Sequence, residues 1–338
     1  MLAEDDDTYC AAARWLRAGR GVVLARVIET FGSAPRPAGS PLVVCEDGLF
    51  LGSVSTGCVE GDVITAALEV IATGAPQRLD FGSVEEETVW RPGLSCGGRI
   101  AVLVERLDAG KLQVFAAARR ERAAGRRAVV ASPLAGGEAR LYCGAELFKR
   151  PPGWSTALGA GASRIAAIED EDWFLHVFEP APRLLLIGAV HVAQSLAPMA
   201  RAAGFDVTIV DPRSAFAAPE RFPGEKLDAR WPDEALADLG LDAATAVAAL
   251  SHDAKIDDCA LRLALESPCF YVGAMGSRAT NARRRARLDA AGVSAKALAR
   301  LEAPIGVDIG ALGPAEIAVA ALASIVRARG RKPLREAS

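Results

Sequence analysis

The chain has 338 residues, of which 51% are hydrophobic and 24% are charged, enough for two cores of ordinary domain size. A formal net charge of −3 excludes the positive field that attracts nucleic acid, with one local exception at Arg283-Arg284-Arg285-Ala286-Arg287. No run of about 18 apolar residues predicts a membrane span. The acidic start Glu4-Asp5-Asp6-Asp7 lacks the positive region of a secretory signal, so we expect a cytoplasmic protein without membrane contact.

The seven cysteines are scattered through a long chain and are odd in number, which argues against a disulfide framework. Without a C-x-x-C pair, and with three histidines in the whole chain, a zinc site is not expected.

Residues 1–179 predict an N-terminal mixed α/β domain. A tract rich in proline, glycine and serine at residues 151–161 predicts a loop, and Pro180-Ala181-Pro182 predicts the domain linker. The expected elements are a helix at residues 8–18, a strand at 21–29, a hairpin of 42–45 and 49–54, a helix at 62–72, and strands at 100–105, 127–131, 139–143 and 173–178.

Residues 183–330 predict a second, Rossmann-like domain, followed by a tail at 331–338. A buried strand at 183–187 leads into the turn Gly188-Ala189-Val190-His191 and a helix, and a second strand at 206–210 ends at Asp211. An acid about this far behind the first glycine is typical of a carboxylate that binds a ribose. The dinucleotide fingerprint has glycine where Val190 stands, because a bare backbone lets pyrophosphate approach the helix.

The rest of this domain continues the alternation of strands and helices, which predicts a doubly wound, mostly parallel sheet with ligands at the strands' carboxyl ends. Pro314 is expected to start the final helix, since its fixed φ suits a first helical turn. The expected elements are strands at residues 244–250 and 269–272, and helices at 257–266, from 278 to about 292, and from 314.

Two glycine-rich loops of the first domain carry a cysteine each. Cys58 follows Gly57 just before a helix, where the dipole favours a thiolate while Glu60 and Asp62 oppose it. Cys96 precedes Gly97 and Gly98 before a strand, and two such loops suggest one shared pocket that faces the second domain. The alternative is that each thiol is a small buried packing residue. The cysteines at positions 10, 45, 143, 259 and 269 are interpreted as packing residues.

Two turns of the second domain offer groups for an anion. His191 can contact an anion at the first helix, or cap the helix or pack beneath the turn. The turn Gly273-Ala274-Met275-Gly276-Ser277-Arg278 offers backbone N–H groups and a guanidinium to a phosphate. The arginines at 283, 284, 285 and 287 face several directions and are expected to be mostly solvated, and Asp308 is either a turn residue or a ligand contact.

Seven motifs in fixed order, spanning about residues 10–330, resemble the xanthine dehydrogenase accessory protein family (XdhC/CoxI). They are Gly32-Ser33-Ala34-Pro35-Arg36-Pro37, Thr56-Gly57-Cys58-Val59-Glu60-Gly61, Cys96-Gly97-Gly98, Gly188-Ala189-Val190-His191-Val192-Ala193, Val210-Asp211-Pro212-Arg213, Tyr271-Val272-Gly273-Ala274-Met275-Gly276-Ser277-Arg278 and Ala303-Pro304-Ile305-Gly306-Val307-Asp308-Ile309-Gly310. The family usually reads G-A-G-H-V-A at the fourth motif, so Val190 is a departure.

The resemblance implies a non-catalytic maturation factor rather than a metabolic enzyme. Its cargo would be the molybdenum cofactor, a molybdopterin in mono- or dinucleotide form. The protein would hold it while a cysteine desulfurase supplies the sulfido ligand, then pass it to an apo-molybdoenzyme of the xanthine dehydrogenase family. A homodimer is also implied. The expected cofactor-binding residues are Cys58, Cys96, Gly57, Gly97, Gly188, His191, Asp211, Gly276, Ser277 and Arg278.

Two other classes remain open from the residues. One is an NAD(P)-dependent oxidoreductase that uses the Gly188–Asp211 unit, although no acid/base pair for hydride transfer is evident and Val190 argues against it. The other is a nucleotide-sensing or structural module.

Overall fold

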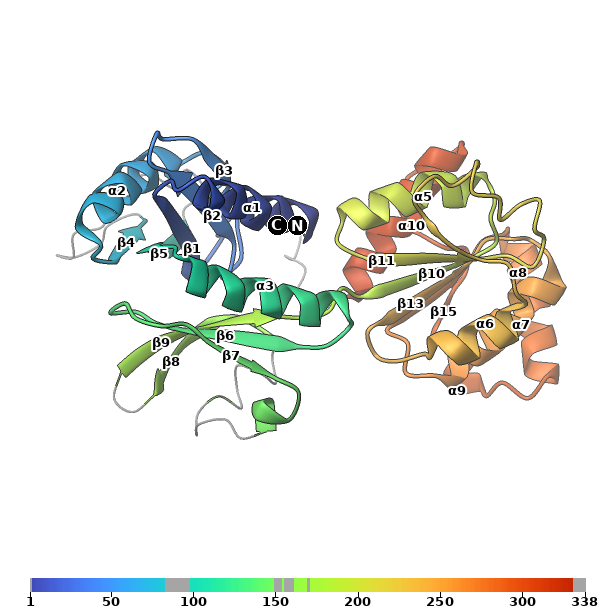
Figure 1. Ribbon diagram of the computed structural model, residues 1–338. Coiled ribbons are helices and arrows are strands. Elements are labelled where there is room, and N and C mark those ends of the chain that lie inside the picture. Colours follow the sequence, from blue (N-terminus) through green and yellow to red (C-terminus); the bar gives the residue numbers. More distant parts are fainter. Residues whose placement is uncertain (1, 83–97, 149–153, 155–160, 169–170, 331–338) are drawn as a thin grey trace. The chain divides into compact units, whose positions relative to one another are not determined.

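The computed structural model describes residues 2–82, 98–148, 154, 161–168 and 171–330 (Figure 1). The chain divides into two compact units, Met1–Ala181 and Pro182–Ser338. The division falls inside the proline-containing segment Pro180-Ala181-Pro182. Within the described ranges, no helix combines the length and the apolar character that a membrane crossing needs.

The first unit contains a five-stranded antiparallel sheet of order β3-β2-β1-β5-β4. Its central strand is β1 (Val22–Phe31), which is buried from Val22 to Ile28. A strand with neighbours on both sides and cover on both faces needs this nearly continuous apolar sequence. The helix α2 (Glu60–Thr73) buries Val63, Ala67 and Val70 in the core of this sheet. The other strands are β2 (Pro41–Cys45), β3 (Phe50–Gly52), β4 (Gln77–Phe81) and β5 (Arg99–Arg106).

A second antiparallel sheet of order β7-β6-β9-β8 completes the first unit. Phe115 of α3 joins the two sheets, because its ring packs against Tyr9 of α1 and Phe178 of β9 at centroid distances of 5.3 and 6.3 Å. The elements are α1 (Leu2–Arg17), α3 (Ala109–Ala123), β6 (Ala128–Pro133), β7 (Arg140–Cys143), the 3-10 helix η1 (Gly144–Phe148), β8 (Arg164–Ile168) and β9 (Glu171–Phe178).

The second unit is built on a six-stranded parallel sheet of order β12-β11-β10-β13-β14-β15. This is the 3-2-1-4-5-6 order of a Rossmann fold, in which the direction of winding changes between the first and fourth strands, here β10 and β13. The strands are β10 (Arg183–Ile187), β11 (Asp206–Val210), β12 (Lys226–Asp228), β13 (Thr245–Ala249), β14 (Tyr271–Ala274) and β15 (Leu301–Glu302).

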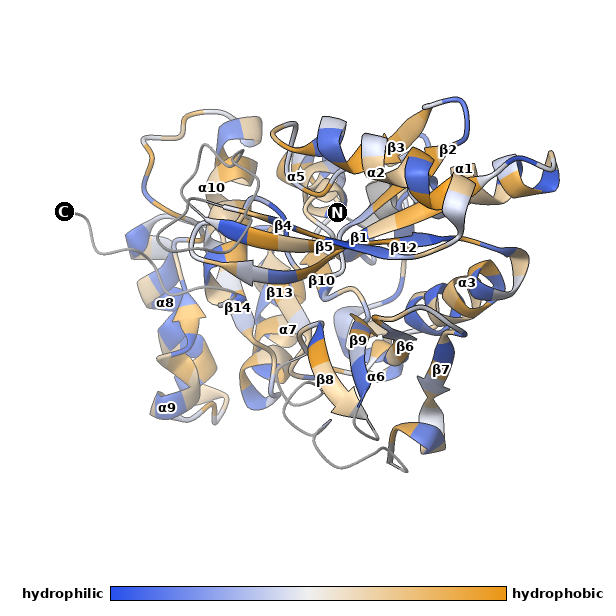
Figure 2. Ribbon diagram, turned by 90° about the vertical axis from the view of Figure 1, so that its left-hand side faces the viewer, coloured by the Kyte–Doolittle hydropathy of each residue, from blue (hydrophilic) through white to orange (hydrophobic). Residues whose placement is uncertain are grey.

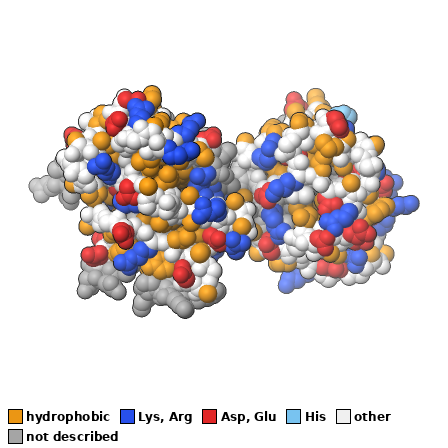
Figure 3. Space-filling view, viewed as in Figure 1, with side chains coloured by type: hydrophobic (Ala, Val, Ile, Leu, Met, Phe, Trp, Pro, Cys, Tyr) orange, Lys and Arg blue, Asp and Glu red, His pale blue; other side chains and the backbone are white. Residues whose placement is uncertain are grey.

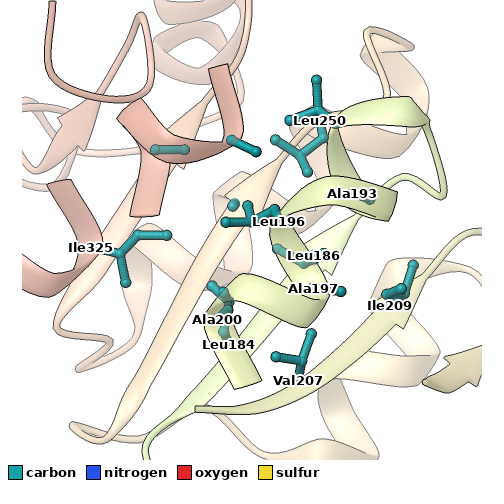
Figure 4. Close-up of a cluster of buried hydrophobic side chains, with 14 of the residues drawn as sticks. Leu184, Leu186, Ala193, Leu196, Ala197, Ala200, Val207, Ile209, Leu250 and Ile325 are labelled. Atoms are coloured by element: carbon teal, nitrogen blue, oxygen red, sulfur yellow. The ribbon is translucent and has the colours of Figure 1, made fainter. Parts of the chain in front are cut away.

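Helices cover both faces of this sheet. On one face, α5 places Leu196 and Ala197 against Leu184 and Leu186 of β10, with Ile325 of α10 beside them (Figure 4). The opposite face is covered by α6 and α7. Helices such as α3 and α9 show both polar and apolar residues in Figure 2, as expected for helices that bury one side. The helices are α5 (His191–Ala202), α6 (Pro232–Leu239), α7 (Ala254–Glu266), α8 (Arg278–Ala290), α9 (Ala295–Leu298) and α10 (Pro314–Ala328).

The predicted fold class, a mixed α/β unit followed by a Rossmann-like parallel sheet, is confirmed. Three boundaries differ: the first helix begins at Leu2, the helix expected from residue 62 begins at Glu60, and the strand expected at 49–54 ends at Gly52. The last difference arises because the chain turns at Ser53 to bond Glu60. The loop expected at 151–161 lies mostly outside the described residues. The sequence interpretation lacked α3, β4, β8, β12 and α6.

Candidate functional site

The turn between β3 and α2 carries the first candidate residues, Gly57 and Cys58. Thr56 and Gly57 both have left-handed backbone conformations, with φ of 67° and 114°. The chain therefore reverses tightly before Val59 caps α2. Cys58 is exposed at this turn, so the alternative of a buried packing residue does not hold. Glu60 was expected to oppose a thiolate here, but its carboxylate is turned back into the turn and bonds backbone amides.

Three motif loops of the first unit meet at one end of the five-stranded sheet. A Cβ added to Gly98 would lie 2.8 Å from the carbonyl carbon of Ser33, so only glycine permits this approach. From the same loop as Ser33, Arg36 donates a hydrogen bond from Nε to the carbonyl oxygen of Ser53, at 3.2 Å. Ser53 begins the turn that presents Cys58. The structure thus joins the loops around residues 32–37, 53–61 and 98.

Cys96 and Gly97 lie outside the described residues, so their approach to Cys58 stays a prediction. The expectation that the remaining cysteines are packing residues holds for Cys45 and Cys269, which are buried, and is wrong for Cys10, which is exposed on α1. A surface hollow of about 490 Å³ lies beside Cys10, Arg14 and Leu51, away from the motif loops. Within the described ranges, no group of three His, Cys, Asp or Glu side chains is arranged to hold a metal ion.

The turn after β10 holds Gly188 and is closed by its own chain. Gly188 has a φ of 109°, and a Cβ there would lie 2.7 Å from the Cα of Ser251. The backbone N–H of Ala189 donates to Oδ2 of Asp211 at 2.8 Å. Val190 is the N-cap residue of α5, and its side chain packs at the edge of the core. His191 is the first residue of this helix, and its side chain is exposed.

Asp211, the expected ribose contact, is buried and already bonded at both oxygens. Arg213 donates from Nε to Oδ1 at 2.9 Å and from Nη2 to Oδ2 at 2.7 Å. Burial by itself raises the pKa of the Asp211 carboxyl, but the hydrogen bonds from Arg213 and Ala189 outweigh burial and lower it. A ribose hydroxyl would therefore have to displace Arg213.

The segment that follows β11 folds over the same turn. Arg221 donates to the carbonyl oxygens of Ala189 at 2.9 Å and Phe216 at 2.6 Å. Gln194 of α5 donates to the carbonyl oxygen of Arg221 at 3.0 Å. The Arg213 guanidinium stacks over the Phe216 ring, 4.0 Å from its centroid. We call residues 213–221 the latch, because they fasten the turn after β10.

The turn after β14 presents Gly276, Ser277 and Arg278 differently. Gly276 has a φ of 125°, and Ser277 caps α8 by accepting a hydrogen bond from the N–H of Thr280 at 3.2 Å. Arg278 is exposed at the first position of α8 and makes no hydrogen bond or ion pair within the described part of the chain. Its charge and the first N–H groups of the helix are directed to the same end of α8.

The basic run on α8 was expected to be mostly solvated, and for two of its arginines this is wrong. Arg284 is buried, donates to the carbonyl oxygen of Met275 at 2.8 Å, and pairs with Asp257 at 3.0 Å. Arg285 donates to the carbonyl oxygens of Leu298 and Leu301. The remaining two, at 283 and 287, are exposed.

Arg284 also connects the two turns, a link that the sequence interpretation missed. Its partner Asp257 accepts a hydrogen bond from Oγ of Ser251 at 2.6 Å, and Ser251 lies against Gly188. A buried chain of contacts therefore runs from Gly188 to Met275. The available signal was the Ser251-His252-Asp253 segment at the end of a strand, where His252 has a φ of 63°. Which of several arginines would reach inward depended on the fold.

Comparison with known proteins gives a consistent family assignment. Residues 15–82 match the XdhC and CoxI family, and residues 184–325 match the XdhC Rossmann domain. The molybdenum cofactor insertion chaperone PaoD of Escherichia coli K12 is 30% identical, over 97% of this chain and 90% of that protein. A protein of Bacillus subtilis 168 described as a probable xanthine dehydrogenase component is 29% identical, over 91% and 93%. A crystal structure described as a xanthine dehydrogenase from Bacillus halodurans superposes with a TM-score of 0.74 at 23% identity, over 97% and 98%, and supports the fold.

Proposed function

The chain belongs to the XdhC and CoxI family, and we propose that it is a chaperone that carries the molybdenum cofactor to an apo-molybdoenzyme of the xanthine dehydrogenase family. It holds the cofactor while a cysteine desulfurase supplies the terminal sulfido ligand, and it acts in the cytoplasm without catalysing a metabolic reaction. The observation that carries this proposal is the 30% identity to a molybdenum cofactor insertion chaperone over nearly the whole of both chains.

The joined loops of the first unit support a site for the metal-sulfur end of the cargo. They surround an exposed Cys58 with glycine-rich backbone, and Arg36 and Gly98 bring neighbouring motifs to the same end of the sheet. Thiols suit a soft molybdenum-sulfur centre. We assign Gly57, Cys58, Cys96 and Gly97 to this end of the site. Cys58 and Cys96 then line one pocket, so a short bifunctional thiol reagent should bridge them within one chain, and sulfurs in separate cores would contradict the assignment.

The turn after β14 supports a site for the phosphate end. Gly276, Ser277 and Arg278 offer an uncommitted guanidinium and helix N–H groups, whereas Asp211 is already bonded to Arg213. We therefore give Arg278 the leading role with phosphate, and give Gly188, His191 and Asp211 supporting roles beside it. Positive and negative side chains are interspersed over the visible face in Figure 3, in keeping with a local anion site rather than a nucleic-acid surface.

The competing proposal, an NAD(P)-dependent oxidoreductase, needs an open turn after β10. Val190, the Asp211–Arg213 pair and the latch all occupy the approach that pyrophosphate and ribose would use. These three features favour the chaperone.

Binding measurements on the purified full chain separate the two functions. We expect isolated molybdenum cofactor to bind and to be retained through gel filtration, and NAD and NADP to bind weakly or not at all. Tight nicotinamide binding without binding of the pterin would overturn the chaperone proposal. Co-purification with an apo-molybdoenzyme and with a cysteine desulfurase tests the partners, and light scattering tests the proposed homodimer.

A further inference from the structure

Glu60 lies at the start of α2, and its carboxylate is the centre around which the Cys58 turn is folded. Each carboxylate oxygen accepts several hydrogen bonds. Oε1 accepts from Oγ of Ser53 at 2.7 Å and from the backbone N–H groups of Val54 at 3.2 Å and Ser55 at 2.9 Å. Oε2 accepts from Oγ of Ser55 at 2.5 Å and from the N–H groups of Gly57 at 2.9 Å and Val59 at 3.3 Å.

The geometry of the turn serves this carboxylate. The left-handed conformations of Thr56 and Gly57 turn successive N–H groups inward, as in the backbone concavities that bind anions. The two serines reinforce the arrangement, because Ser53 accepts from the N–H of Thr56 at 2.8 Å and Ser55 from that of Val59 at 3.0 Å. Charge-assisted hydrogen bonds of this kind are about twice as strong as neutral ones.

We propose that Glu60 is a positioning residue: its carboxylate gathers the amides of residues 54–59 and thereby holds Cys58 in the orientation in which it meets the cargo. This inference rests on the proposed function, which places Cys58 in the site. Glu60 acts through the turn rather than on the ligand, because it is 8% exposed and both its oxygens are bonded within the chain.

The ionisation of Glu60 agrees with this role. Burial alone raises its pKa, but hydrogen bonds from Ser55 and Ser53 and from backbone amides outweigh burial and lower the pKa to about 2. The carboxylate is therefore charged throughout the neutral range. A group that stays charged in this way organises donors and does not exchange protons with a ligand.

The test compares Glu60→Gln with Asp62→Asn in the full chain. Both variants remove one negative charge from the first turn of α2, but Asp62 is exposed and lies outside the set of bonds that fold the turn. The glutamine amide places a donor against N–H groups that need an acceptor. We expect Glu60→Gln to speed hydrogen exchange of the amides at residues 54–59 by about ten-fold or more, with α2 still protected. Asp62→Asn should leave this exchange unchanged.

The same variants are then measured for two properties of Cys58. Glu60→Gln should change the rate at which iodoacetamide alkylates Cys58 and should weaken binding of isolated molybdenum cofactor about as much as Cys58→Ser does. Ser55→Ala removes part of the set and should give a smaller effect of the same kind, which keeps the test decisive if Glu60→Gln folds poorly. Unchanged exchange at 54–59, or equal effects of Glu60→Gln and Asp62→Asn, would overturn the proposal.

Failure of the proposed function gives a different result. If Cys58→Ser leaves cofactor binding unchanged, Cys58 has no part in the site and the chaperone assignment of this turn is wrong. The exchange and alkylation rates still decide whether Glu60 sets the position of Cys58. If exchange rises in Glu60→Gln while cofactor affinity stays at the wild-type value and Cys58→Ser lowers it, Glu60 shapes the turn without positioning the thiol for binding, and the proposal fails.

Discussion

The turns after β10 and β14 are built alike, yet their polar groups have different partners. Each follows a parallel strand, contains a left-handed glycine and opens a helix. After β10, Ala189 is bonded to Asp211 and Arg221, so its N–H and carbonyl are both occupied. After β14, Arg278 has no partner in the described chain. The difference teaches that a strand-turn-helix with glycines indicates an anion site only where its donors are still available.

The strongest test of this comparison removes the link between the two turns. Arg284→Met leaves Asp257 as a buried carboxylate without its cation, so the free energy of unfolding should fall by about 3–5 kcal/mol. Arg283→Met, at an exposed position of the same helix, should change it by about 0.5 kcal/mol or less. Urea unfolding of both variants measures the difference. Equal stabilities would show that the Arg284–Asp257 pair does not hold the turns together.

The next largest effect concerns the turn after β14. Arg278→Ala should weaken binding of the molybdenum cofactor by ten- to hundred-fold, since a charge-assisted hydrogen bond contributes about 1.5–3 kcal/mol. Arg278→Lys should recover part of the loss, because lysine keeps the charge without the planar fork. Arg283→Ala is the matched control. Arg285 is unsuitable for that purpose, because it bonds the carbonyls of Leu298 and Leu301. Equal affinities of the alanine variants at 278 and 283 would make Arg278 an ordinary surface residue.

A smaller effect is expected at the turn after β10. Val190→Gly should raise the affinity for simple dinucleotides a few-fold, because pyrophosphate gains an approach to α5. The gain stays small while Arg221 bonds Ala189, so Val190→Gly combined with Arg221→Ala should bind NAD more tightly than either single variant. Calorimetric titration measures the series. If none of the variants gains affinity, neither Val190 nor the latch is the obstacle.

The smallest effect is confined to acid. The pKa of Asp211 is lowered below its ordinary value of 3.8 by bonds from Arg213 and Ala189 that outweigh burial. Its contribution to stability is therefore complete above about pH 4 and is lost as the pH falls through the lowered pKa. Asp211→Asn should remove this part of the acid dependence of urea unfolding. An unchanged pH profile would mean that the carboxylate is not what closes the turn after β10.

Much of the fold followed from local patterns in the sequence. The apolar run of β10 and the spacing from Gly188 to Asp211 predicted strand, helix and strand correctly. Two missed helices carried usable signals, since Asp108 caps α3 by accepting from Lys111 and Pro232 begins α6. The strand β4 is short and alternates polar with apolar residues, a weaker signal.

The partners of the site residues were harder to predict than the elements. The sequence placed Asp211 at the end of a strand, but a ribose carboxylate and a carboxylate that bonds Arg213 have the same position in the sequence. It also placed Glu60 in the first turn of α2, without showing that the preceding turn folds onto it. Such bonds depend on left-handed residues and side-chain directions that a hydrophobic pattern does not encode.

The close approach of Gly188 to Ser251 changes how its glycine should be interpreted in this chain. Any side chain at 188 would overlap the backbone at 251, so the packing of two neighbouring strand ends would select glycine here even in the absence of a nucleotide. A glycine retained for this reason is uninformative about ligands. Searches that infer dinucleotide binding from the first glycine of the fingerprint would therefore select this protein on grounds of its internal architecture, and the second glycine position, held here by Val190, carries the diagnostic information.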